Sequence, residues 1–242
     1  MTKNTIPPHA FIIGASRGLG LSIGREAPKK MCILGTARTA ASAFKAQQEE
    51  WSWCTGDIAD PTTVVEVLDA IRDLPITHIF WVAGIHRKQQ FPTASYEDID
   101  VMTRTHFTGP VNILRECIRR APRNRPLHLI TIASTSSYRV RDQETLYCAL
   151  KAAKAHFTRN IARELARDIP GSKTLLVNPG GMNTDLLKGI ADVSNWMSPA
   201  VVAKLIWDRV ARQTKIYDEM NILRQDDGSP KVVNGPQLPE MP

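Results

Sequence analysis

Short apolar runs alternate with longer segments of helical pattern along most of this 242-residue chain. Strands are predicted at residues 9–13, 31–37, 51–55, 76–83, 127–133, 173–178 and 220–223, the last as an edge strand. Helices are predicted at residues 19–27, 61–73, 96–120, 146–166 and 199–212, with N-caps at Asp60 and Ser198 and a kink at Pro110. The alternation predicts an α/β fold in which helices cover both faces of a parallel sheet. We expect one domain over residues 1–224 and a proline-bearing tail over 225–242.

A glycine-rich turn follows the first predicted strand. Gly14, Gly18 and Gly20 have the spacing G-x-x-x-G-x-G and lead into a predicted helix. Backbone N–H groups at such a helix start, together with the positive end of the helix dipole, suit a pyrophosphate. Three glycines would equally serve a tight strand-to-helix turn that binds nothing. The turn therefore predicts phosphate binding and leaves the purely structural alternative open.

The end of the second predicted strand distinguishes two nucleotide cofactors. NAD sites usually carry an acidic residue there for the ribose 2′-hydroxyl, whereas NADP sites carry a basic residue for the 2′-phosphate. This chain has Arg38 at that place, Arg17 in the glycine-rich turn and no competing acid. We therefore expect NADP(H). The alternative is that Arg38 is an ordinary solvated loop arginine.

Three residues near the fifth predicted strand form a candidate catalytic group. Ser134 ends that strand, and Tyr147 and Lys151 occupy positions i and i+4 on one face of the following helix. Because a nearby ammonium favours ionisation of a phenol, Tyr147 is a candidate proton donor to a carbonyl oxygen. Ser134 would hydrogen-bond the same oxygen. Taken alone, Tyr-x-x-x-Lys is weak evidence, because the pattern occurs by chance in many helices.

Composition narrows the classes of partner. The formal net charge of +7 favours an anionic ligand. The four cysteines include no Cys-x-x-Cys pair, and no histidine cluster has ligand spacing, so we expect no metal and a reduced, cytoplasmic setting. No apolar stretch has the length of a membrane span, and the amino terminus lacks a signal-peptide pattern. Five arginines form a basic cluster: Arg115, Arg119, Arg120, Arg123 and Arg125. The cluster suits either a face that binds nucleic-acid phosphates or a solvated helix end, and the solvated helix end is the favoured interpretation.

In order and spacing, the motifs of residues 9–184 resemble the short-chain dehydrogenase/reductase family. The matching features are Gly14-x-x-x-Gly18-x-Gly20, Asp57, Ala83-Gly84, Ser134, Tyr147-x-x-x-Lys151, Pro179-Gly180 and Thr184. The resemblance implies a Rossmann-type fold and an NADP(H)-dependent carbonyl reductase or alcohol dehydrogenase. It also implies a homodimer or tetramer that pairs through helices 96–120 and 146–166.

The resemblance also implies a role for each matching residue. Tyr147 would be the general acid/base, Lys151 would lower its pKa and bind the nicotinamide ribose, and Ser134 would orient the substrate carbonyl. Asp57 would accept the adenine amino group, or it would only cap a turn. The cofactor-binding residues implied are Gly14, Ser16, Arg17, Gly18, Leu19, Gly20, Arg38, Asp57, Ile58, Ala83, Gly84, Tyr147, Lys151, Pro179, Gly180, Met182 and Thr184.

Two departures from the family pattern bear on function. Val82 replaces an asparagine whose amide ties neighbouring strands together. His106 stands where an asparagine carbonyl holds a water of the proton relay, so it is a candidate catalytic residue, although an ordinary hydrogen-bonded histidine is the more favoured interpretation. These departures motivate a second hypothesis, a non-catalytic NADP-binding sensor or scaffold. Residues 181–197 would form an apolar loop over a hydrophobic substrate, or a packed surface helix.

Overall fold

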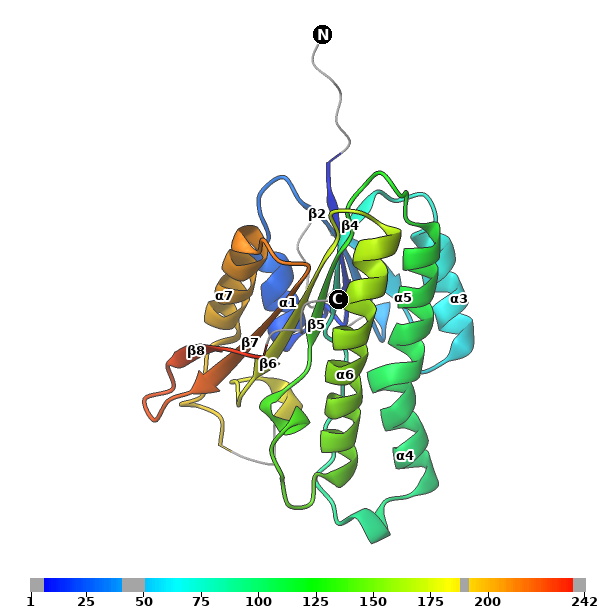
Figure 1. Cartoon of the computed structure of the whole chain (residues 1–242). Coiled ribbons are helices and arrows are strands. Elements are labelled where there is room, and N and C mark those ends of the chain that lie inside the picture. Colours follow the sequence, from blue (N-terminus) through cyan, green and yellow to red (C-terminus); the bar gives the residue numbers. More distant parts are fainter. Residues whose placement is uncertain (1–6, 41–50, 188–191, 237–242) are drawn as a thin grey trace.

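The computed structural model describes residues 7–40, 51–187 and 192–236. Within these residues, eight strands form one sheet in the order β3-β2-β1-β4-β5-β6-β7-β8 (Figure 1). The strands are β1 His9–Ile13, β2 Cys32–Ala37, β3 Ser52–Thr55, β4 Ile76–Trp81, β5 His128–Ile132, β6 Lys173–Pro179, β7 Tyr217–Arg224 and β8 Pro230–Asn234. Strands β1 to β7 are parallel, whereas β8 is antiparallel to β7.

Helices cover both faces of the sheet, which confirms the predicted three-layer α/β fold. α1 (Gly18–Arg25) and α7 (Pro199–Arg212) lie side by side on one face (Figure 1). The helices on the other face are α3 (Pro61–Ala70), α4 (Tyr96–Thr103), α5 (Gly109–Arg120) and α6 (Thr145–Asp168). Because the strands run parallel, their carboxyl ends meet at one edge, where open α/β sheets bind ligands.

The strands are apolar on both faces because each face meets a layer of helices. Along β1, Ala10 and Ile12 pack into the cluster beneath α1 and α7, whereas Phe11 and Ile13 pack into the cluster on the opposite face. All four side chains are fully buried. The two-residue period of a strand thus divides one continuous apolar run between two cores.

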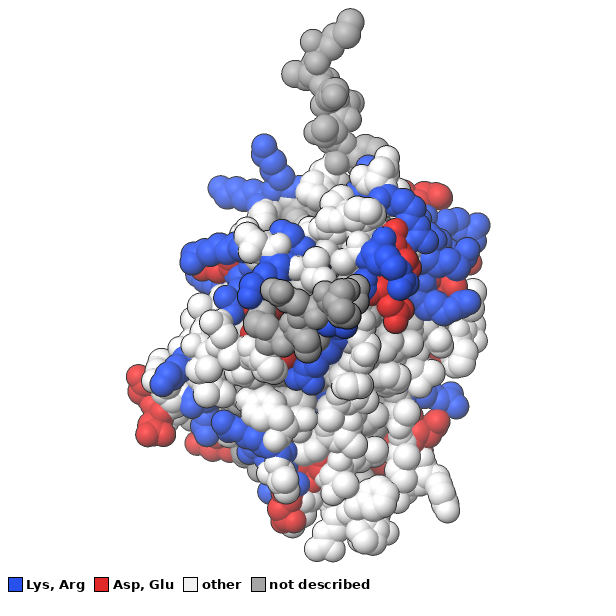
Figure 2. Space-filling view, in the orientation of Figure 1, with Lys and Arg blue, Asp and Glu red and all other residues white. Residues whose placement is uncertain are grey.

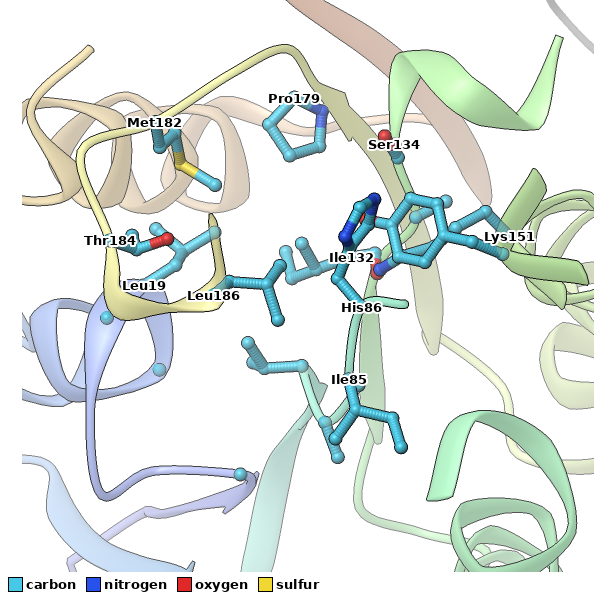
Figure 3. A pocket seen from close by; sticks show the side chains of 18 of the residues that line it. Leu19, Ile85, His86, Ile132, Ser134, Lys151, Pro179, Met182, Thr184 and Leu186 are labelled. Carbon is cyan, nitrogen blue, oxygen red and sulfur yellow. The ribbon is translucent and has the colours of Figure 1, made fainter. Parts of the chain in front are cut away.

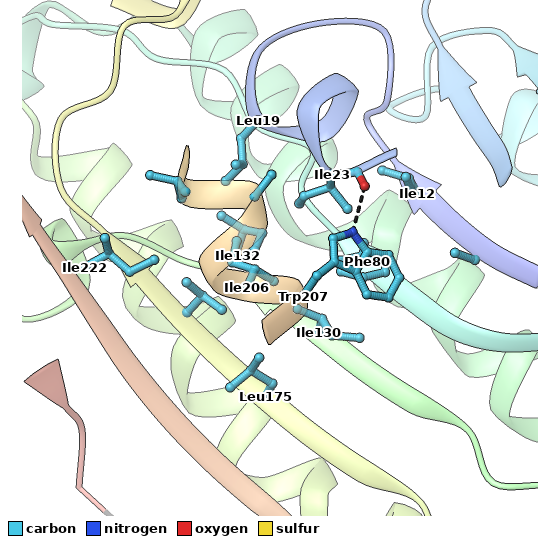
Figure 4. Close-up of a cluster of buried hydrophobic side chains, with 14 of the residues drawn as sticks. Ile12, Leu19, Ile23, Phe80, Ile130, Ile132, Leu175, Ile206, Trp207 and Ile222 are labelled. Atoms are coloured by element: carbon cyan, nitrogen blue, oxygen red, sulfur yellow. Dashed lines mark hydrogen bonds between the residues drawn. The ribbon is translucent and has the colours of Figure 1, made fainter. Parts of the chain in front are cut away.

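Trp207 links α7 to the helix that follows the glycine-rich turn (Figure 4). Its indole Nε1 donates a hydrogen bond of 2.8 Å to the Ile23 carbonyl of α1. The Trp207 ring also packs against Phe80 of β4, with ring centroids 4.8 Å apart. α7 therefore holds α1 in place against the sheet.

The predicted helix over residues 96–120 is interrupted. In place of the kink expected at Pro110, a turn of different geometry separates two helices. Between α4 and α5, the turn η2 (Arg104–Thr108) has π-helical geometry. Pro110 has no N–H to donate to the carbonyl four residues earlier, that of His106, so a regular α-helix loses a bond at this point. Gly109 is also needed here, because an added Cβ would lie 2.0 Å from the Ile58 carbonyl oxygen.

Several predicted ends and caps also differ from the structure. α1 ends at Arg25 and α3 at Ala70, and β4 ends at Trp81, each before its predicted limit. Asp60 caps α3 as expected, accepting from the Thr62 N–H at 2.9 Å. Ser198 occupies the N-cap of α7, but its side chain makes no capping hydrogen bond.

Residues 220–223 lie in β7 as predicted, but β7 is not the edge strand, because β8 continues the sheet beyond it. The turn between them contains Asp227, whose carboxylate accepts from the Ser229 N–H at 2.9 Å. Gly228 in this turn has φ +78, a conformation that suits glycine. Part of the expected tail is therefore a strand, while residues 237–242 lie outside the described residues.

The arginines of the basic cluster contact groups at the ends of α5 and α6. Arg115, Arg119 and Arg120 lie 2.7, 2.9 and 3.4 Å from carboxylate oxygens of Glu116. Arg123 donates to the Asp168 carbonyl at 3.2 Å. Figure 2 shows acidic side chains among the basic ones at the upper right of this face. The contacts are those of the solvated helix end that the sequence favoured.

Candidate active site

One cavity of about 520 Å³ opens at the carboxyl ends of the strands (Figure 3). Its wall contains Ser134 and all seventeen predicted cofactor-binding residues, from Gly14 to Thr184. Of the predicted site residues, only His106 lies outside this wall. Residues separated by most of the chain thus meet around one space, as the parallel topology requires.

The glycine-rich turn forms a close-packed cradle at one end of the cavity. Gly14 has φ +94, and an added Cβ would lie 2.9 Å from the Ala83 backbone. An added Cβ on Gly20 would lie 1.9 Å from the Gly14 carbonyl oxygen. α1 starts at Gly18 with no acidic residue in its first turn, so its positive end faces the cavity uncompensated. The residues present therefore fit a pyrophosphate.

Arg17 and Arg38 are exposed at the rim of this end of the cavity. Neither forms an ion pair with a carboxylate in the described part of the chain. Asp57, which also lines the cavity, accepts from the Ala59 N–H at 3.0 Å and so caps a turn. Its proposed contact with adenine stays a prediction.

Ser134, Tyr147 and Lys151 converge where β5 ends and α6 begins. Tyr147 is 7% exposed and shares a side-chain hydrogen bond with Ser134. The Ser134 hydroxyl also accepts from the Ser136 N–H at 3.1 Å. Lys151 donates from Nζ to the Ile132 carbonyl at 3.3 Å, and this nitrogen lies 5.6 Å from the centroid of the Tyr147 ring.

Burial controls the ionisation of this group, which corrects the expectation for Tyr147. Burial raises the pKa of Tyr147 well above its ordinary value, and the hydrogen bond with Ser134 only partly offsets this effect. Burial also lowers the pKa of Lys151, to about 8. A charged group loses its hydration inside a protein, so burial shifts the pKa of each residue in the direction of its neutral form, while Lys151 remains an ammonium below about pH 8. Tyr147 therefore keeps the proton that a donor must hold at neutral pH.

His106 is fully buried behind Tyr147, with the two ring centroids 5.6 Å apart. Its Nε2 lies 3.0 Å from the Ile85 nitrogen and 2.6 Å from the Ile85 oxygen, and it accepts from the first or donates to the second according to its tautomer. Burial lowers the pKa of His106 well below its ordinary value. The ring is thus a neutral support for the backbone that follows β4.

A family model described as short chain dehydrogenase matches residues 8–194. That range includes the glycine-rich turn, Ser134, Tyr147 and Lys151. The chain belongs to the short-chain dehydrogenase family. The resemblance inferred from the motifs is confirmed, and the protein is an oxidoreductase of this family.

Two curated relatives of this short-chain dehydrogenase are reductases. The 3-oxoacyl-[acyl-carrier-protein] reductase of Escherichia coli is 24% identical over 230 residues, which cover 91% of each chain. The NADPH-dependent pterin aldehyde reductase of Arabidopsis thaliana is 29% identical over 189 residues, covering 73% of this chain and 76% of the relative.

Solved structures share the fold of this short-chain dehydrogenase. A 3-ketoacyl-(acyl-carrier-protein) reductase from Brucella melitensis complexed with NADH has a TM-score of 0.78 at 20% identity, covering 88% of this chain and 96% of that one. A short chain dehydrogenase from Burkholderia cenocepacia in complex with NADP has a TM-score of 0.74 at 21% identity, covering 91% and 96%.

Two residues of the short-chain dehydrogenase site were missed from the sequence. His86 lies beside Tyr147, with ring centroids 4.7 Å apart and edge-to-face geometry. Its Nε2 lies 3.5 Å from a carboxylate oxygen of Glu144, which stands just before α6. Both residues line the cavity. Glu144 lies three positions before Tyr147, but no local signal connects it with His86 in the polar loop after β4.

Lys154 was also missed. Its Nζ is fully buried, donates to the Ala83 carbonyl at 3.1 Å, and lies 4.8 Å from the centroid of the Trp81 ring. Lys154 therefore ties α6 to the end of β4. The signal was a lysine on the same helix as Lys151, at a spacing of i+3 that shares its face.

Proposed function

We propose that this short-chain dehydrogenase reduces a carbonyl compound with NADPH. The observation that carries the proposal is the convergence of Ser134, Tyr147 and Lys151 beside the glycine cradle, in one cavity. The names of the two curated relatives support carbonyl chemistry, because one acts on an oxoacyl group and the other on an aldehyde. The same residues would also catalyse the reverse reaction, in which the corresponding secondary alcohol is oxidised to the carbonyl compound.

Each residue of the convergent group has a task in this reaction. Bound nicotinamide supplies the hydride chemistry. Ser134 and Tyr147 hydrogen-bond the substrate oxygen, and Tyr147 gives it a proton as negative charge develops there. Lys151 in its ammonium form stabilises the resulting phenolate. His106 is a positioning residue, because its ring holds the Ile85 backbone beside the site.

The remaining cavity residues would hold the dinucleotide. The glycine cradle binds the pyrophosphate, Arg17 and Arg38 bind the 2′-phosphate, and Asp57 and Ile58 adjoin the adenine. Four further residues that line the cavity would hold the nicotinamide: Pro179, Gly180, Met182 and Thr184. Lys151 binds the ribose next to it.

Replacing Arg38 with alanine should change cofactor selectivity. Loss of a charge-assisted hydrogen bond to the 2′-phosphate raises the KM for NADPH about tenfold or more, whereas the KM for NADH stays within about twofold. Steady-state kinetics with both nucleotides measures the effect. Arg72→Ala is the matched control, since Arg72 is an exposed arginine that pairs with Asp69 away from the cavity. An unchanged preference in Arg38→Ala would remove the basis for choosing NADPH.

Lys151 should impose a pH limit on reduction. Because burial lowers its pKa to about 8, the ammonium form that stabilises the phenolate is lost above that pH. We expect kcat/KM for carbonyl reduction to be level below pH 8 and to fall above it. Tyr147, whose pKa is raised, keeps its proton throughout this range. In Lys151→Arg the falling limb should disappear, and a wild-type profile that is level up to about pH 10 would contradict the assignment.

The proposed function is tested by NADPH oxidation against a panel of aldehydes, ketones, quinones and α-dicarbonyls. Turnover with NADPH supports it. NADPH binding without turnover of any carbonyl would favour the sensor or scaffold hypothesis, and no binding of either nucleotide would refute the cofactor site.

We also propose a homodimer, and light scattering of the purified protein measures it. No helix in the described part of the chain is long and apolar enough to cross a membrane.

A further inference from the structure

The cavity has a second group of charged residues, away from the glycine cradle and around Tyr147. The cationic members are Arg139, Arg141 and Arg224. Across the whole cavity wall, the acidic residues are Asp57, Glu144 and Asp185. Asp57 lies at the adenine end, so on the substrate side the three arginines outnumber Glu144 and Asp185.

His86 lines the cavity beside Tyr147, with their ring centroids 4.7 Å apart. Figure 3 shows the His86 side chain at the cavity wall, and this side chain is 3% exposed. Glu144 occupies Nε2, while Nδ1 is buried and has no hydrogen-bond partner within the described residues. Because burial lowers the pKa of His86, the ring is neutral, and a neutral ring that donates from Nε2 has an acceptor at Nδ1. His86 therefore suits an uncharged donor group of a ligand and leaves an anion to the arginines.

Arg139 and Arg141 come from the segment between η3 (Thr135–Ser137) and α6. Both are exposed, and neither has a carboxylate within salt-bridge distance in the described ranges. The charge of Arg141 acts on the Tyr147 phenol, because it offsets a part of the rise that burial causes in the pKa of Tyr147. Arg224 is stacked over Trp196 at 4.4 Å, and the Arg139 guanidinium lies 6.0 Å from the centroid of the exposed Tyr138 ring. Stacking leaves the N–H edge of a guanidinium open, so Arg139 and Arg141 have donors that a ligand can reach.

We propose that the substrate carries an anionic group, a carboxylate or a phosphate ester, and that Arg139 and Arg141 bind it. The proposal rests on the proposed function and names its substrate class. The carbonyl lies against Ser134 and Tyr147, and the anion lies on the side of the α6 start. Apolar side chains line the rest of this part of the cavity and receive the carbon body: Ile85, Leu186, Trp196 and Leu223. Guanidinium groups suit both kinds of anion because their planar fork donates to two oxygens at once.

Matched alcohols test the proposal by calorimetry on the NADPH-loaded protein. The probes are 4-(hydroxymethyl)benzoate, 4-(hydroxymethyl)phenyl phosphate and the neutral 4-(hydroxymethyl)benzamide. We expect at least one anion to bind about tenfold more tightly than the amide, and the stronger of the two identifies the anion. In Arg141→Gln and in Arg139→Gln, this advantage should fall about fivefold.

Two control variants separate this site from general charge effects. Arg87→Gln removes a cation one residue from His86, but Arg87 pairs with Asp98 at 3.3 Å and lies outside the cavity. Arg72→Gln removes an exposed cation that pairs with Asp69 outside the cavity. Both should keep the preference of the wild-type protein for the anions, because neither residue contacts the proposed anion site.

The outcomes distinguish the substrate class from the reaction. Equal binding of anions and amide, or an advantage that survives the double variant Arg139→Gln/Arg141→Gln, would overturn the anionic substrate. The anionic substrate would also be overturned if the protein reduced 4-formylbenzamide as fast as it reduced 4-carboxybenzaldehyde. In that case the proposed carbonyl reduction would still hold. If neither aldehyde nor any other carbonyl were reduced, the proposed function would fail, while a calorimetric preference for the anions would still establish the site.

Discussion

Tyr147→Phe should lower kcat for carbonyl reduction by about 10²–10⁴-fold, the usual contribution of a general acid. Phenylalanine keeps the ring that packs against His86 and His106, at centroid distances of 4.7 and 5.6 Å. It removes only the hydroxyl that hydrogen-bonds with Ser134 and carries the proton. The affinity for NADPH should stay within about threefold, since the glycine cradle and Arg38 are unchanged.

Tyr138→Phe is the matched control for this experiment. Tyr138 lies four residues after Ser134, is 52% exposed and does not line the cavity. Its loss of a hydroxyl should leave kcat unchanged. Stopped-flow measurement of NADPH oxidation separates chemistry from product release. Retention of most activity by Tyr147→Phe would assign the proton transfer to another group and would count against the catalytic role proposed for Tyr147.

Arg159→Met should destabilise the protein by about 3 kcal/mol, because it leaves a buried carboxylate without its ion pair. The carboxylate is that of Glu219, which is 1% exposed. Arg159 donates to its two oxygens at 2.9 and 3.1 Å. Asn178 donates to one of them at 2.9 Å, and the Tyr217 hydroxyl donates to the other. The group joins α6 to β6 and β7, so its loss loosens the sheet beside the site.

Urea denaturation measures this effect as a lower midpoint with an unchanged slope. Arg104→Met is the control, because Arg104 forms an exposed pair with Asp100 at 2.9 Å and its removal should cost less than about 1 kcal/mol. The double variant Arg159→Met/Glu219→Leu should recover much of the stability, since it leaves no buried charge unpaired. If Arg159→Met were as stable as wild type, the network would have no structural importance.

The predicted strands lie in the sheet and the predicted site residues line one cavity for the same reason. Local periodicity distinguishes a strand that is buried on both faces, such as β1, from an amphipathic helix, such as α5. The glycine turn, Ser134 and the Tyr147–Lys151 pair are also short-range patterns: the first two follow the carboxyl ends of β1 and β5, and the pair stands at the start of α6. Topology then brings them together without further information. Helix ends were less accurate because capping depends on one or two side chains, as Ser198 illustrates.

The sequence alone determined the α/β architecture and the family, and it identified part of the cavity wall, including the glycine turn, Ser134, Tyr147 and Lys151. Only the tertiary structure decided how these residues ionise, because burial, which no spacing encodes, raises the pKa of Tyr147 and lowers that of Lys151. It also decided the pairing of His86 with Glu144, the tie from Lys154 to β4, and the addition of β8 to the sheet. These contacts join residues on different elements. Their existence depends on how the elements pack, and a pattern within one element carries no information about its neighbour.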